Sequence, residues 1–244
     1  MKPYNKENKT KSEEVNEMFN NIAPTYDSLN HILSLNIDRR WRRQVVKIVE
    51  DVAPGDILDV ATGTGDLAIA LSRANPQAKV VGVDPSVGML AVAKEKITRG
   101  ALEQQIELRC TAAESLDVAS ESFDVATVAF GVRNFGDLRG GVSEMVRALR
   151  PGGILIVLEF SRCTHWLMGP LYRIYSRWVM PTVGGLLSRD KKAYSYLPES
   201  IEEFEQPAEF LAVLEQCGLK RCYNRPQFFG VAQIYIGVKV EDNE

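Results

Sequence analysis

Apolar positions along the middle of the chain follow two different periods. Short aliphatic runs typical of buried strands occur beside segments in which apolar residues recur at the spacing of a helix. The pattern predicts strands at 57–60, 79–83, 106–110, 123–130 and 154–160, and helices at 66–73, 86–97 and 137–149. Strands and helices that alternate in this way predict a parallel sheet with helices on both faces.

The N-terminal part of the chain is polar first and amphipathic afterwards. We expect residues 1–14 to form a disordered or frayed tail, although Thr10 and Glu13 have the spacing of a helix capping box. A helix is then predicted from apolar positions at i, i+3, i+4 and i+7, namely Val15, Met18, Phe19 and Ile22. A second helix is predicted to begin at an Asp38 cap. Residues 15–50 therefore form a helical layer ahead of the first strand.

The C-terminal segment carries another pattern. A helix is expected over residues 210–217, where Gly218 ends it, and two strands follow at 219–223 and 231–238. Because only a short loop joins these two strands, we expect an antiparallel pair added to the parallel sheet. The whole chain is therefore predicted to form a seven-stranded, mostly parallel α/β fold of Rossmann-like type with an antiparallel C-terminal hairpin.

The composition is that of one large domain. Of the 244 residues 45% are hydrophobic, and we assign 15–240 to a single domain with an insertion at 161–206. A formal net charge of −3 argues against broad binding of nucleic acid. Four cysteines without a C-x-x-C pair and two histidines argue against a metal site or a disulfide framework, which favours a reducing cytoplasm. The N-terminus lacks the apolar core of a signal peptide, and no apolar run is long enough to span a membrane.

A glycine-containing turn follows the first predicted strand and carries the clearest chemical signal. Gly63 and Gly65 stand between the strand and the next helix, with Asp84 about 20 residues further on, as in the dinucleotide fingerprint. Asp59 inside the strand and Asp66 at the start of the helix argue against a pyrophosphate, because both add negative charge. A cationic ligand with a ribose diol, such as S-adenosylmethionine, fits this turn better.

Several motifs together resemble one family. They are Phe19-Asn20-x-Ile22-Ala23, Tyr26-Asp27-x-x-Asn30, Trp41, the segment 58–66, Phe130-Gly131-Val132-Arg133-Asn134, Leu149-x-Pro151-Gly152-Gly153 and Leu158-Glu159-Phe160-Ser161. Over roughly residues 15 to 238 the chain resembles the ubiquinone/menaquinone biosynthesis C-methyltransferase family, and its sheet resembles that of class I methyltransferases. The resemblance implies an enzyme that methylates a ring carbon of a polyprenylated quinol, in the menaquinone branch demethylmenaquinol, with S-adenosylmethionine as cofactor.

The same resemblance assigns the cofactor-binding residues. It places Thr64 and Gly65 at the methionine end of the cofactor, Asp84 at the ribose hydroxyls, and Ala112 and Ala113 at the adenine; Gly63 in the same turn is a further cofactor-binding residue. The chain departs from the family at position 112, where relatives often have Asn or Asp, so only backbone groups can bind adenine there. Position 129 is Ala where relatives often have Ser, and Thr62 replaces a common Gly.

The expected catalytic residues are Arg133 and Asn134, with Tyr26 as their partner. They follow the fourth predicted strand, on the rim where open parallel sheets bind ligands. Methyl transfer to carbon needs a ring carbon beside an ionised hydroxyl, so the reduced quinol must be the substrate. An arginine is a poor free base but a good clamp for an oxyanion, which assigns Arg133 to orientation and charge stabilisation. A structural loop arginine paired with an acid is the other interpretation.

The alternatives left open are C-methylation of a ubiquinol precursor, a nicotinamide oxidoreductase, a nucleic-acid methyltransferase and a non-catalytic quinone-binding protein. Prenyl length, oligomeric state and the proton acceptor are also open. One further prediction concerns residues 165–187, where apolar side chains recur on one helical face beside Arg173 and Arg177: Leu167, Leu171, Ile174, Tyr175 and Trp178. This segment is proposed as a lid that contacts the membrane surface, unless it packs on the sheet or in a subunit interface.

Overall fold

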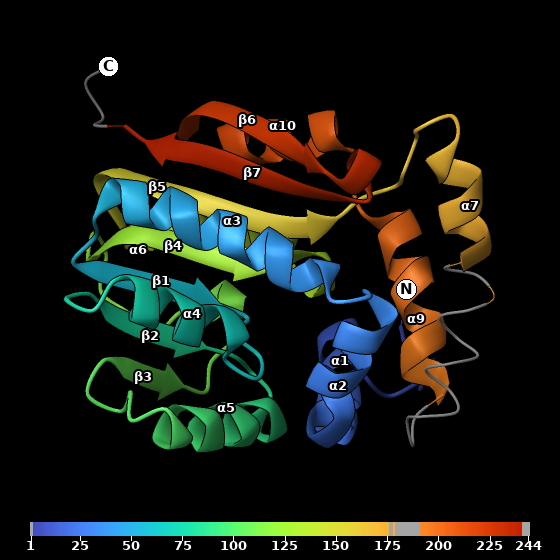
Figure 1. The fold of residues 1–244 in the computed structure, drawn as a ribbon, viewed down its shortest axis with the longest axis horizontal. Helices are drawn as coiled ribbons and strands as arrows, with labels where there is room; N and C mark the ends of the chain where they lie inside the picture. The colour runs from blue at the N-terminus through green and yellow to red at the C-terminus, as the bar shows by residue number, and fades with distance from the viewer. Residues whose placement is uncertain (1, 176–177, 179–190, 241–244) are drawn as a thin grey trace.

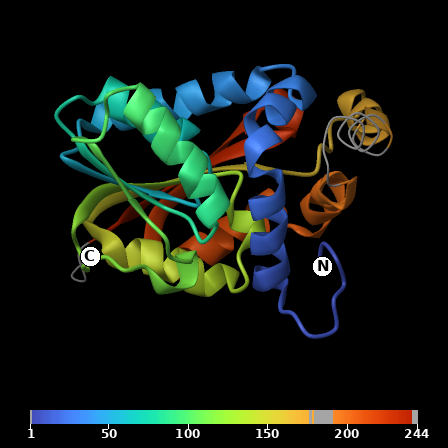
Figure 2. The same cartoon turned by 90° about the horizontal axis from the view of Figure 1, so that it is seen from below.

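The protein is organised around a seven-stranded sheet. The computed structural model describes residues 2–175, 178 and 191–240, and Figures 1 and 2 show the fold from two directions. The strands are β1 (Asp56–Val60), β2 (Lys79–Val83), β3 (Ile106–Arg109), β4 (Phe123–Ala129), β5 (Leu149–Phe160), β6 (Leu219–Gln227) and β7 (Ala232–Lys239). Their spatial order is β3-β2-β1-β4-β5-β7-β6.

The predicted mixture of parallel and antiparallel strands is confirmed. Strands β1 to β5 pair in parallel, whereas β7 pairs antiparallel with both β5 and β6. The order changes direction at β1, which lies between β2 and β4. Ligands of open parallel sheets bind at the carboxyl end of the strands near such a switch point.

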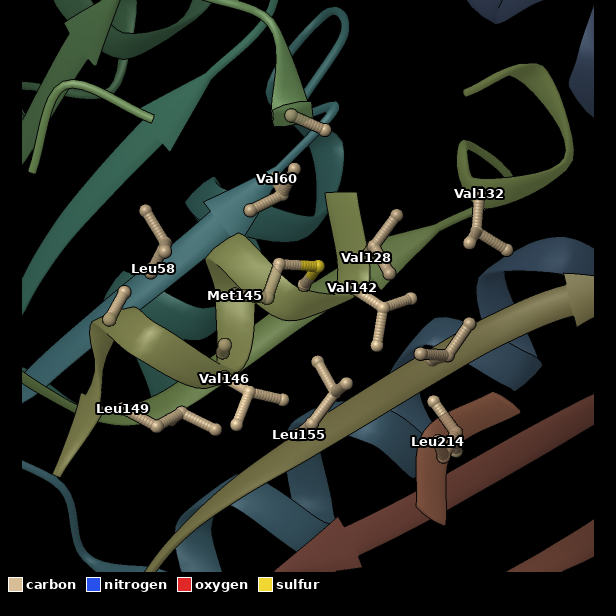
Figure 3. Close-up of a cluster of buried hydrophobic side chains, with 14 of the residues drawn as sticks. Leu58, Val60, Val128, Val132, Val142, Met145, Val146, Leu149, Leu155 and Leu214 are labelled. Carbon is tan, nitrogen blue, oxygen red and sulfur yellow. The ribbon is translucent and has the colours of Figure 1, made fainter. Parts of the chain in front are cut away.

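Helices cover both faces of this sheet, as predicted. They are α1 (Lys11–Ile22), α2 (Tyr26–Leu33), α3 (Ile37–Val52), α4 (Asp66–Ala74), α5 (Val87–Arg99), α6 (Leu138–Ala148), α7 (Met168–Ile174), α9 (Lys191–Glu203) and α10 (Pro207–Gln216). The core on one face joins α3, α4 and α5 to the sheet, and the core on the other face joins α6 and α10. Figure 3 shows part of the second core, in which Met145 and Val142 of α6 pack over the strand residues.

The N-terminal helices lie beyond the carboxyl ends of the parallel strands. In Figure 1 the arrowheads of β1, β4 and β5 point toward α1, α2 and α9. A third core of buried apolar residues connects these helices with one another and with Met89 of α5. The predicted helical layer therefore covers the edge of the sheet at which ligands are expected.

Several predicted boundaries differ from the structure. The capping box of Thr10 and Glu13 is confirmed, so α1 begins at Lys11, within the segment 1–14 that we expected to be frayed. The carboxylate of Glu14 is buried and accepts hydrogen bonds from two backbone N–H groups of the preceding tail. The predicted Asp38 cap is wrong: Asn36 precedes α3, and Asp38 lies buried inside its first turn.

Strand β5 is also longer than predicted. It begins at Leu149 instead of residue 154, because Leu149 pairs with Phe123 before a shift in register that includes Gly152 at a φ of 82°. The turn chemistry of Pro151 and Gly152 thus produces an irregularity inside a strand. The last two strands likewise extend past their predicted ends.

Candidate active site

The turn after β1 has the sharp geometry that its glycines predicted. Positive φ angles occur at Ala61 (51°), Gly63 (57°) and Gly65 (79°), and helix α4 starts at the next residue. The strained left-handed position therefore falls on Ala61, and Thr62 avoids it. A Cβ atom on Gly131, in the loop after β4, would lie 2.6 Å from that of Ala61. Only a residue without a side chain allows the two loops to approach so closely.

Asp84 directly follows β2, and its side chain reaches back to this turn. Its carboxylate accepts hydrogen bonds from the backbone N–H of Gly63 (2.9 Å) and of Ser86 (2.8 Å), and the residue is 7% exposed. Burial raises the pKa of Asp84 to about 6, although both N–H donors act in the opposite direction. The carboxylate is thus held at the strand end with oxygen lone pairs left for a ligand.

A cavity of about 280 Å³ lies beside the turn, and we call it the turn cavity. Four of the predicted cofactor-binding residues line it, namely Gly63, Asp84, Ala112 and Ala113. Residues of α1, Phe19 among them, form the opposite wall. Because position 112 is Ala, only a methyl group and backbone are available there, as expected from the sequence.

The other two predicted cofactor residues are placed differently. A Cβ atom on Gly65 would contact Ala93 of α5, so this glycine serves the packing of two helices. The hydroxyl of Thr64 donates to Asp27 (2.5 Å), and Lys96 pairs with both Asp27 (2.8 Å) and Asp66. The negative charge expected from Asp66 is therefore paired with a lysine.

Thr64 lines a separate cavity of only about 30 Å³, which we call the small cavity. Asp59 also lines it and is almost fully buried, with hydrogen bonds from the hydroxyls of Thr62 (2.7 Å) and Thr127 (2.6 Å). Burial raises the pKa of Asp59 to about 6, against the effect of these two donors.

A second large cavity, also of about 280 Å³, is mainly apolar, and we call it the apolar cavity. Its walls come from α1, α2, α3, α7, α9 and the ends of β4, β5 and β6. Three aromatic rings form one side of this cavity. The ring centre of Trp41 lies 6.1 Å from the ring centres of both Phe130 and Phe160, and the two phenylalanine ring centres are 4.5 Å apart. Trp41 is a core residue.

All three predicted catalytic residues line the apolar cavity. Arg133 lies in a short 3₁₀ helix after β4, and its side chain is 6% exposed. Its Nη1 donates to the fully buried Glu159 (2.6 Å) and to the carbonyl of Phe130 (2.6 Å), and its guanidinium stands 5.4 Å from the centre of the Phe160 ring. The pairing with an acid that we considered is therefore present, but the acid is buried.

Asn134 and Tyr26 stand between the two large cavities, because each lines both. The side-chain oxygen of Asn134 accepts a hydrogen bond from Tyr196 (3.1 Å), and its Nδ2 finds no partner among the described residues. A buried amide N–H without an acceptor is unfavourable, so this position suits a ligand oxygen. Burial raises the pKa of Tyr26, whose hydroxyl bonds with Asn30, so the phenol is neutral at physiological pH.

Sequence reasoning missed several residues of this site. Tyr196 and Tyr172 line the apolar cavity from α9 and α7, and no local motif marks them. Arg42, one turn after Asp38 on α3, forms an ion pair with it, and their i, i+4 spacing was the available signal.

Both histidines contact neighbouring side chains. His31 pairs with Asp38 (3.0 Å), and the ring of His165 is tilted against that of Phe229, with 5.0 Å between ring centres. Among residues 2–175, 178 and 191–240 there is no group of three His, Cys, Asp or Glu side chains that could hold a metal ion. Within the same ranges no helix is both long and apolar enough to cross a membrane.

Comparison with known proteins gives full-length matches. The sequence profile of the ubiE/COQ5 methyltransferase family matches residues 7–239. A demethylmenaquinone methyltransferase from Bacteroides fragilis is 44% identical over 98% of this chain and 97% of its own length. The ubiquinone/menaquinone biosynthesis C-methyltransferase UbiE of Syntrophotalea carbinolica is 44% identical over 91% of this chain and 92% of its own.

Solved structures share the fold at lower sequence identity. A SAM-dependent methyltransferase from Thermotoga maritima superposes with a TM-score of 0.61 at 18% identity, covering 91% of this chain and 99% of that one. A SAM-dependent methyltransferase from Aquifex aeolicus gives a TM-score of 0.58 at 16% identity, covering 80% and 88%. The seven-stranded class I methyltransferase fold is thereby confirmed.

Proposed function

The chain belongs to the ubiE/COQ5 methyltransferase family, and from this premise we propose that it transfers a methyl group from S-adenosylmethionine to a ring carbon of demethylmenaquinol. Family and fold make it a methyltransferase that depends on S-adenosylmethionine. This excludes a nicotinamide oxidoreductase and a non-catalytic quinone-binding protein. The choice of quinol and the roles of single residues are the proposal.

The turn cavity has the groups that such a cofactor needs. Asp84 would accept hydrogen bonds from the ribose hydroxyls, and the backbone at Gly63, Ala112 and Ala113 would contact the rest of the adenosine. When bound, the cofactor supplies a methyl group on a positively charged sulfur, which a carbon nucleophile can displace. The carboxylate of Asp84, with two N–H donors and little solvent, is a fitting acceptor.

One observation carries the choice of a quinol: the apolar cavity meets the turn cavity at a shared wall. Phe19, Tyr26, Phe130 and Asn134 line both. A flat aromatic ring in the apolar cavity can therefore face a methyl donor in the turn cavity, as an in-line displacement requires. The aromatic walls suit a naphthalene ring with an isoprenoid chain.

Three side chains would align the ring and stabilise its charge. Ionisation of the quinol hydroxyl places negative charge on the oxygen and on the neighbouring carbon, which then attacks the methyl group. The unpaired Nδ2 of Asn134 and the neutral phenol of Tyr26 can donate to that oxygen. Arg133 keeps Nη2 for the same purpose, since no hydrogen bond joins this atom to any residue in the described ranges.

A direct assay tests the substrate. Purified protein is incubated with S-adenosylmethionine and a short-chain demethylmenaquinol, and mass spectrometry detects a product heavier by one methylene group. We expect methylation of the chemically reduced quinol and none of the oxidised quinone, because only the quinol makes the ring carbon nucleophilic. Methylation of a benzoquinol precursor, with no product from demethylmenaquinol, would favour the ubiquinone branch instead.

Peripheral contact with the membrane is part of the proposal. Exposed apolar side chains gather on and before α7: Trp166, Leu167, Leu171 and Ile174. Leu171 and Phe228 are both exposed and also line the apolar cavity, so the mouth of this cavity has an apolar rim. A polyprenyl tail could leave through this rim into lipid. Arg177 and residues 179–187 of the proposed lid lie outside the described residues.

Flotation with anionic liposomes tests this contact. Trp166→Glu and Leu171→Glu should reduce the fraction of protein that floats, because a charge replaces an apolar side chain at the interface. Val87→Glu on α5 is a matched control, since Val87 is 66% exposed but does not line the apolar cavity. Equal flotation of the folded native protein and both variants would reject the docking role and leave packing as the function of α7.

A further inference from the structure

The two large cavities and the small cavity meet at one residue. Tyr26 lines all three, and the small cavity also shares Ala61 and Gly63 with the turn cavity. A cofactor whose ribose lies at Asp84 and whose sulfur faces the apolar cavity must place its third substituent, the amino-acid head, elsewhere. The small cavity opens beside both, since it shares Arg42 with the apolar cavity and Gly63 with the turn cavity.

The amino-acid head carries an ammonium and a carboxylate, so its site needs both signs of charge. Asp59 and Asp66 supply carboxylates to the small cavity. Arg42 is the one cation among the residues that line it, all of which are described. Two other basic residues nearby are already engaged, since Lys96 pairs with Asp27 and Asp66, and Arg133 pairs with Glu159 on the far wall.

Arg42 is fixed in position and keeps free donors. It projects from α3 with its side chain 14% exposed, and Nη1 pairs with Asp38. Asp38 is itself held by Ser34 (2.5 Å) and His31 (3.0 Å), and the guanidinium lies 5.3 Å from the centre of the Phe130 ring. A guanidinium has five N–H donors, and among the described residues Arg42 donates only to Asp38.

We propose that Arg42 binds the α-carboxylate of S-adenosylmethionine in the small cavity. A planar fork of N–H donors matches a carboxylate, and Asp38 sets its orientation from the opposite side. The ammonium of the same ligand would lie near the carboxylate of Asp59, which also lines the small cavity, whereas the carboxylate of Asp66 is paired with Lys96. This role rests on the cofactor assignment made above, and it adds a residue of α3 to a site otherwise built from strand ends.

Two ligands that differ only in the amino-acid head provide the test. S-adenosylhomocysteine carries the head, whereas 5′-methylthioadenosine keeps the adenosine and the sulfur but lacks it. Calorimetry measures the Kd of both ligands on one preparation of each variant. Arg42→Ala should weaken S-adenosylhomocysteine by about 10- to 100-fold and 5′-methylthioadenosine by less than about twofold, because a charged hydrogen bond is lost with one ligand only.

Further variants separate this role from folding and from general cofactor binding. Arg42→Gln keeps a hydrogen-bond donor for Asp38 and should show the same selective loss of affinity for S-adenosylhomocysteine. Arg42→Lys keeps the positive charge and should retain part of the preference for S-adenosylhomocysteine over 5′-methylthioadenosine. Arg43→Ala changes an exposed arginine on the same helix and should affect neither ligand. Unfolded protein lowers the binding stoichiometry and leaves the ratio of the two Kd values unchanged.

Two outcomes would overturn the inference in distinguishable ways. If the native protein prefers S-adenosylhomocysteine and Arg42→Ala and Arg42→Gln keep the full preference, the carboxylate binds elsewhere and the proposed function stands. If the native protein binds neither ligand, the cofactor assignment itself fails. A third ligand, decarboxylated S-adenosylhomocysteine, retains the ammonium, so its Kd should be the same in the native protein and in Arg42→Ala.

Discussion

The turn cavity and the apolar cavity have the same volume, about 280 Å³, but the chain builds them in different ways. The turn cavity uses the ends of β1 and β2, where Gly63 and Asp84 are held by backbone hydrogen bonds. The apolar cavity is enclosed by helices from both ends of the chain. The polar groups of the turn cavity come from strand ends, with α1 as its opposite wall, whereas most walls of the apolar cavity are helices.

This difference indicates which cavity can determine specificity for the methyl acceptor. Strand ends and tight turns admit few substitutions, so the turn cavity suits the invariable part of the reaction, the methyl donor. Helix faces can exchange one apolar side chain for another of similar volume. The apolar cavity can therefore be adapted to different acceptors while the donor site is kept. The predictions below test this separation of tasks.

Arg133→Ala should have the largest effect, and only on the acceptor side. Loss of one donor to a developing oxyanion typically costs about 10²- to 10³-fold in turnover. We therefore expect turnover with demethylmenaquinol to fall by this amount, while calorimetry gives a Kd for S-adenosylhomocysteine within about threefold of the native value. Native turnover in this variant would refute the assignment.

Two controls accompany this variant. In Arg133→Ala the buried carboxylate of Glu159 loses its partner, which should lower the free energy of unfolding by about 3–5 kcal/mol. The double variant Arg133→Ala/Glu159→Gln removes this unpaired charge, and its turnover should still be as low as that of Arg133→Ala. Arg150→Ala removes two solvent-exposed ion pairs, with Asp56 and Asp124, at the opposite end of the strands, and should leave turnover unchanged.

Asp84→Ala should affect the donor side only. Losing one or two charge-assisted hydrogen bonds, each worth about 1.5–3 kcal/mol, should weaken S-adenosylhomocysteine by tenfold or more. Affinity for 5′-methylthioadenosine should fall by a similar factor, because that ligand has the same ribose. Calorimetry that gives the native Kd for both ligands would contradict the role of Asp84.

The pH dependence of cofactor binding should be smaller and should come from the same carboxylate. The pKa of Asp84 is raised to about 6, and its ionised form is the better acceptor. Below pH 6 a proton must leave before the ribose binds, so the Kd should rise by up to about tenfold per pH unit. The asparagine variant Asp84→Asn should be weaker at pH 8 and nearly independent of pH. An equal pH dependence in both proteins would place the titrating group elsewhere.

The same raised pKa has a consequence of opposite sign for folding. The folded state binds the proton of Asp84 more tightly than the unfolded state, whose pKa lies near 3.8. The contribution to the free energy of unfolding is therefore complete below about pH 4 and is lost as the pH rises through about 6. Urea titrations at several pH values should show this loss, and Asp84→Asn should show less of it.

Tyr175→Phe should produce the smallest effect. The hydroxyl of Tyr175 donates to the carbonyl of Leu33 (2.5 Å) and so ties the segment after α7 to the end of α2. Its removal should lower the free energy of unfolding by about 0.5–1.5 kcal/mol, as measured by urea denaturation. The Kd for S-adenosylhomocysteine should be unchanged, and a large rise in that Kd would show that the two cavities are not separable.

The same contrast explains what the sequence could predict. Gly63 and Asp84 were found because strand, turn and carboxylate follow one another at fixed spacing within one local motif. Thr64 shares that motif, yet its hydroxyl bonds with Asp27. This contact brings α2 onto the turn, and such long-range packing leaves no local trace. The fold was predictable for the same reason as the turn, because hydrophobic periods are local.

The apolar cavity shows the limit of this approach. Arg133 and Asn134 were located by a family motif and by their place after the fourth strand, but their partners Glu159 and Tyr196 come from a later strand and from α9. The wrong Asp38 cap is a case of the same kind: an acid before an apolar run usually caps a helix, whereas here it is drawn into the interior by Arg42.

The wall shared by Phe19, Tyr26, Phe130 and Asn134 links the occupancy of the two cavities. Side chains that both ligands touch give a direct route for free-energy coupling between them. Such coupling is reciprocal: the factor by which the cofactor changes the affinity for quinol equals the factor by which quinol changes the affinity for cofactor. With both ligands bound as proposed, each would therefore change how tightly the other is retained, and by the same factor.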